Sequence, residues 1–83
     1  MIIANELKES LERELSICSM AITFYKKQIK SLEKKHGINT SAFLEKFEEG
    51  SMGDEQDFFD WHAFHKLLSS WIKTKNVLQP LIK

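Results

Sequence analysis

The side chains with the most chemistry gather in the stretch Gly53–His65, which reads GDEQDFFDWHAFH. Two carboxylates, Asp57 and Asp60, and two imidazoles, His62 and His65, stand at helical spacing, where side chains three apart are neighbours. Such groups can hold a hard cation or zinc. The acids lack EF-hand spacing, however, and the histidines lack the glutamate of an HExxH motif. We therefore predict no metal site, helix-start and surface roles for the acids, and a partly buried His65.

Nucleophilic catalysis has one candidate, Cys18, and the surrounding sequence offers it no catalytic context. No Cys-His signature adjoins it, and no serine stands in a nucleophile-elbow motif. Cys18 falls on the apolar line of a helix, where a thiol is a small core filler. We therefore predict no catalytic residue, no cofactor and no enzyme activity. A lone cysteine cannot form an intrachain disulfide, which favours a reducing cytoplasm.

The acidic stretch also predicts a surface for another protein. Asp57 and Asp60 would project beside Trp61, so that carboxylates form a rim next to a large aromatic ring. Tryptophan is a frequent anchor of protein interfaces. The predicted partner-binding residues are Asp57, Phe59, Asp60, Trp61 and Trp71.

Residues 3–36 lack glycine and proline and are predicted to form one long helix. From Leu11 onward the apolar residues alternate at spacings of four and three, which is the pattern of left-handed helix packing. Its members are Leu11, Leu15, Cys18, Ile22, Tyr25, Ile29 and Leu32. Gly37 is suited to the left-handed residue after the helix, and Ile38 can fold back onto Leu32.

Two further helices are predicted after this stop. Asn39 or Thr40 caps a short helix over about 41–49, which Gly50 ends. Asp54 is the expected N-cap of a last helix over about 54–78. Pro80 marks the limit of that helix.

The last helix has an apolar sector that covers about half of its circumference, by 100° per residue. The members of this sector are Phe58, Trp61, Phe64, Leu68, Trp71, Ile72 and Leu78. The first helix carries a second apolar line, formed by Ile17, Ala21 and Phe24. This excess calls for a covering short helix, a partner chain, or both. We predict one all-α domain over 1–83: a long antiparallel helical hairpin with a short connecting helix, forming a dimeric helical bundle.

The charges balance at twelve basic and twelve acidic residues, so no overall field attracts nucleic acid. They are unevenly placed: residues 37–60 hold seven acids and one lysine, and residues 61–83 hold four lysines and no acid. The acidic start of the last helix should therefore lie near the basic end of the first. That basic end holds Lys26, Lys27, Lys30, Lys34 and Lys35. It supports an alternative function as a nucleic-acid-binding regulator, although only one arginine is present.

No apolar run approaches the ~20 residues of a membrane span. Glu6, Lys8 and Glu9 interrupt the N-terminus too early for the apolar core of a signal peptide. We therefore expect no membrane partner and a cytoplasmic location.

Two motifs, FLEKFEEG from Phe43 and GDEQDFFDW from Gly53, resemble those of short all-helical antitoxin-like proteins of archaea and cyanobacteria. In that group a long amphipathic helix leads into FLxxFxxG, GDxxDFFxW and a final helix. A second aromatic residue often follows the tryptophan there, whereas this chain has His62. The resemblance covers residues 41–61 and implies a homodimeric protein–protein interaction module that binds and neutralises a small toxin.

Overall fold

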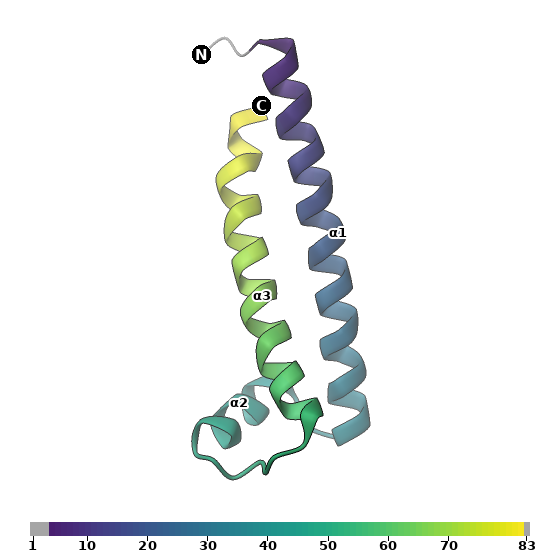
Figure 1. The fold of residues 1–83 in the computed structure, drawn as a ribbon, viewed down its shortest axis with the longest axis vertical. Coiled ribbons are helices and arrows are strands. Elements are labelled where there is room, and N and C mark those ends of the chain that lie inside the picture. The colour runs from purple at the N-terminus through teal and green to yellow at the C-terminus, as the bar shows by residue number, and fades with distance from the viewer. Residues whose placement is uncertain (1–3, 83) are drawn as a thin grey trace.

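The computed structural model describes residues 4–82, which form three α-helices and no strand. They are α1 (Asn5–His36), α2 (Thr40–Glu48) and α3 (Gln56–Leu78), followed by the short 3₁₀ helix η1 (Gln79–Ile82). Figure 1 shows α1 and α3 side by side and antiparallel, with α2 tucked across the end where they are joined. The all-α hairpin with a short connecting helix is therefore confirmed. The predicted start of the first helix at residue 3 lies outside the described residues.

The end of α1 follows its local sequence. Gly37 adopts φ 69°, the left-handed conformation that glycine reaches without strain. Its N–H donates to the Glu33 carbonyl at 2.8 Å, which is the single bond of an αL C-cap. Ile38 and Leu32 both pack against the hydrophobic core. The chain can therefore turn sharply and bring α2 back onto the hairpin.

The start of α2 resolves the choice between two caps. The Asn39 side chain accepts a hydrogen bond from the Ala42 N–H at 2.8 Å, so Asn39 is the N-cap. Thr40 is the first helical residue, and its hydroxyl is free to bond across to other helices. α2 runs one residue earlier than the predicted 41–49, and Gly50 follows it with φ 75°.

The predicted N-cap of the last helix was wrong. α3 begins at Gln56 with Glu55 in the cap position, and no side-chain cap bond is made there. Asp54 is exposed and precedes the helix by two residues. The first turn of α3 closes on Glu55, whose carbonyl accepts a hydrogen bond from the Phe58 N–H at 3.0 Å.

The core lies at the joined end of the hairpin. Ile29, Phe43, Phe58 and Trp61 form one buried cluster, with α2 contributing Phe43 as its cover. The open half of the hairpin is thinly covered. Within α3, no residue after Trp61 is buried, and within α1 none before Cys18 is. Because this buried cluster lies at the joined end, the open half of the hairpin leaves much apolar surface exposed to water.

Candidate interaction surface

The joined end is held by an ion-paired contact between α1 and α3. Asp57 Oδ2 accepts hydrogen bonds from Lys35 Nζ at 2.6 Å and pairs with His36 Nε2 at 3.0 Å. The hydrogen bond from Lys35, and then that from His36, lower the pKa of Asp57 below its ordinary value. The same bond raises the pKa of Lys35. The prediction that the acidic start of the last helix lies near the basic end of the first is confirmed. Asp57 is therefore engaged by an ion pair within the chain.

Trp61 is the centre of the core. Its side chain is fully buried, and its ring stacks on Phe43 with centroids 4.0 Å apart. Its Nε1–H donates to the Thr40 hydroxyl at 3.1 Å, and that hydroxyl donates to Glu33 Oε2 at 2.9 Å. The prediction that Trp61 offers its ring to a partner is corrected, because α2 covers it. Its position on α3 turns it toward α1 and α2 together.

The other predicted partner-binding residues do not form one site. Phe59 is 47% exposed and meets Phe47 edge-on at 5.9 Å. Asp60 is half-buried and accepts a hydrogen bond from Gln56 Nε2 at 2.9 Å. Trp71 is half-buried and lies about 16 Å farther along α3, at ~1.5 Å per residue. Their binding to a partner remains a prediction, split between the joined end and the long side of the hairpin.

The two histidines of the HxxH pair have different surroundings. His62 stacks on Phe47 with ring centroids 4.5 Å apart, and His65 is half-buried as predicted. Within residues 4–82 there is no group of three or more potential ligand side chains close enough to hold a metal ion. Cys18 is buried as a core residue, in line with its predicted role as an apolar filler.

One long side of the hairpin carries an apolar surface that includes only one of the predicted partner-binding residues, Trp71. On α1, Ile17, Met20 and Phe24 are 47%, 71% and 52% exposed. On α3, Leu67 is 42% exposed beside the half-buried Trp71. Spacings of three and four residues place each group on one face of its helix.

A run of aromatic rings shows that these two groups share one side. Phe24 contacts Tyr25 edge-on at 5.1 Å, and Tyr25 contacts Phe64 on α3 at 5.8 Å. Phe64, Leu67 and Trp71 are in turn neighbours along α3. We call this surface the hairpin face, and its members are Ile17, Met20, Ala21, Phe24, Phe64, Leu67 and Trp71. The second apolar line of the first helix had indicated its α1 half, whereas Met20 and Leu67 were missed because they fall outside the lines that each helix alone suggests.

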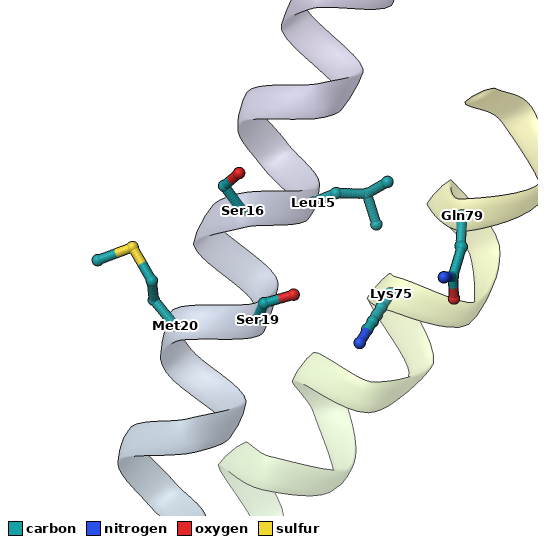
Figure 2. Close-up of a pocket in the computed structure, with 6 residues that line it drawn as sticks. All are labelled: Leu15, Ser16, Ser19, Met20, Lys75 and Gln79. Carbon is teal, nitrogen blue, oxygen red and sulfur yellow. The ribbon is translucent and has the colours of Figure 1, made fainter.

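A shallow cavity of about 510 Å³ lies between the open halves of α1 and α3. Its lining residues are Leu15, Ser16, Ser19, Met20, Lys75 and Gln79. Figure 2 shows Leu15 and Ser19 directed toward α3, while Ser16 and Met20 point away from it. The lining has no carboxylate, imidazole or thiol, so it presents neither a catalytic pair nor a metal-ligand set.

The basic end of α1 is exposed at all five lysines. Lys35 is the member that forms an ion pair, with Asp57, among the described residues. No helix within residues 4–82 is long and apolar enough to cross a membrane. Comparison with known proteins adds no assignment, since no family model, curated protein or solved structure matches this chain.

Proposed function

We propose that this chain is a protein–protein interaction module of the antitoxin-like kind, which binds and neutralises a small partner toxin and catalyses no reaction. The observation that carries the proposal is the hairpin face. Monomeric proteins seldom leave a contiguous apolar surface of more than a few hundred Å² in water. Here large apolar side chains from both long helices stand exposed together on one side.

The hairpin has the properties of a binding scaffold. Its core is concentrated around Trp61, where α2 contributes Phe43 and where Asp57 of α3 pairs with Lys35 of α1. The open half has no buried residue on α3 and gains most from contact with another chain. Burying a Leu or Phe side chain contributes about 1.5–3 kcal/mol. A few such residues suffice to hold a partner.

The antitoxin-like part of the proposal draws support from two features of the joined end. The motif resemblance covers residues 41–61, which form α2, the turn and the start of α3. Phe59 is exposed there, and the acids of residues 45–60 surround the same end. An exposed ring among carboxylates suits a basic partner, because opposite charges speed and orient association.

Co-expression with the product of the neighbouring gene tests this function. We expect the partner alone to slow growth, and co-expression of this chain to restore growth and yield a co-purifying complex. Phe59→Glu should weaken that complex, whereas Thr23→Glu, on an exposed part of α1, should leave it intact. The proposal fails if the wild-type chain neither restores growth nor co-purifies with the neighbouring product.

A nucleic-acid-binding regulator is the second candidate, favoured by the exposed lysines of α1. Phosphate contacts made by Lys27 and Lys30 would give binding that weakens steeply with salt. Lys27→Glu combined with Lys30→Glu should abolish such binding. Binding that survives both changes and is independent of salt would exclude this candidate.

A further inference from the structure

We propose that the hairpin face is occupied by a second copy of this chain. Two hairpins then pack into a four-helix bundle, with α1 against the second copy's α1 and α3 against its α3, each pair antiparallel. This inference rests on the proposed interaction function and names its first partner. The spacing of the apolar residues, the charges along α1 and the relative heights of α1 and α3 support it.

The spacing indicates that helices cover the face. On α3 the line Phe64, Leu67, Trp71, Thr74 and Leu78 alternates steps of three and four. On α1 the line Glu14, Ile17, Ala21, Phe24 and Gln28 also alternates steps of three and four. Such alternation keeps a stripe aligned with a partner helix crossing at about 20°, as in four-helix bundles. Two such stripes side by side match the two helices of another hairpin.

The α1 stripe is complementary to itself when it is reversed. With a two-fold axis between Met20 and Ala21, Ile17 meets Phe24 of the second copy. The same axis sets the acid-rich residues 6–14 level with the lysine-rich residues 27–35 of the second copy, and the small Ala21 lets the two helices approach closely. Apolar residues thus meet apolar residues and acid meets base, as an isologous interface requires.

The charges along α1 disfavour a parallel arrangement of the two α1 helices. Residues 6–14 hold four acids and two bases, and residues 26–35 hold five lysines and one acid. Two parallel α1 helices in contact would set the lysine-rich ends side by side, where like charges repel. Antiparallel α1 helices place each acidic half against a basic half.

The same two-fold axis also relates the α3 helices of the two copies. Tyr25 lies beside Phe64, and Ser19 and Lys75 line one cavity, so the middle of α1 is level with Trp71. The two Trp71 rings therefore meet at the centre of the interface, where tryptophan contributes most to binding.

Cysteine cross-linking tests this geometry in the full-length chain. In a Cys18→Ala background, Ala21→Cys places two thiols near the axis, within the 4.4–6.8 Å Cα separation that a disulfide accepts. We expect mild oxidation to convert most of the Ala21→Cys chain to a disulfide-linked dimer. Thr23→Cys, on an exposed part of α1 outside the stripe, is the matched control and should stay largely monomeric. An Ala21→Cys chain that stays monomeric, or equal cross-linking of both variants, overturns the proposal.

These outcomes separate the inference from the function beneath it. A chain that is monomeric yet co-purifies with the neighbouring gene product overturns the second-copy proposal and leaves the interaction function standing. A cross-linked dimer that binds and rescues nothing sustains the second-copy proposal and overturns the antitoxin-like function.

Discussion

Thr40→Val should destabilise the protein far more than one exposed hydroxyl would suggest. The Thr40 hydroxyl donates to Glu33 Oε2 and accepts from the Nε1–H of the fully buried Trp61. Valine keeps the shape and removes both bonds. A hydrogen bond to a charged group contributes about 1.5–3 kcal/mol, and a buried donor left unpaired costs about 1–3 kcal/mol.

The Thr40 backbone N–H still donates to Glu33 at 2.7 Å, which limits the loss at the carboxylate. We therefore expect a decrease of about 2–4 kcal/mol in the free energy of unfolding. A chain of this size has a total stability on the order of 4–12 kcal/mol, so the effect is easily measured. The physical cause is that this hydroxyl joins all three helices at the core.

Urea unfolding followed by circular dichroism, at one chain concentration, measures this change. Thr74→Val is the matched control, because the Thr74 hydroxyl is exposed and bonds to Ser70 O within its own helix. That control should stay within about 0.5 kcal/mol of wild type, as surface substitutions usually do. Thr40→Val and Trp61→Phe should cost less together than the sum of their separate costs, because each removes the same bond. A Thr40→Val effect no larger than that of Thr74→Val, or strict additivity with Trp61→Phe, would show that the Thr40 hydroxyl does not support the core.

Three further predictions concern the joined end. Asp57→Asn should lower the melting temperature at neutral pH. Because the pKa of Asp57 is lowered in the folded protein, its stabilising contribution is present above the unfolded pKa near 3.8 and is lost as pH falls through the folded pKa. The melting temperatures of variant and wild type should therefore converge in acid, and a difference that is independent of pH would contradict this. Phe43→Ala should cost about 3–5 kcal/mol and release α2, which hydrogen exchange would detect as lost amide protection in residues 40–48 ahead of α1. Gly37→Ala should cost about 1–2 kcal/mol in urea unfolding despite open space around it, because φ 69° strains any residue with a Cβ; an unchanged midpoint would argue against this conformation.

The helix ends that sequence predicted well depend on local chemistry. Gly37 and Asn39 act through their own backbone and nearest neighbours, so their roles follow from residue type and position. Asp54 has an equally good local signal, yet α3 begins two residues later, with Glu55 in the cap position and no side-chain cap bond. Residue type alone therefore does not decide which of two neighbouring acids precedes the helix.

The candidate site was harder to predict because exposure depends on neighbouring helices. A helical wheel placed Trp61 in a wide apolar sector but could not show that Phe43 of α2 stacks on it. The same wheel could not show that the Phe24 ring contacts Tyr25, or that Tyr25 in turn contacts Phe64 on the other long helix. Predicting the hairpin face required the relative rotation of α1 and α3, which no single segment encodes.

Sedimentation equilibrium of the purified, untagged chain at micromolar concentrations shows whether the hairpin face joins two copies of this chain. We expect a mass of twice the 9.7 kDa chain. Leu67→Glu, on the hairpin face, should shift the mass to one chain, while Ser70→Glu, exposed on the outer side of α3, should leave the dimer intact. A wild-type mass of 9.7 kDa across that range, with circular dichroism showing a fully helical chain, would rule out the two-copy assembly.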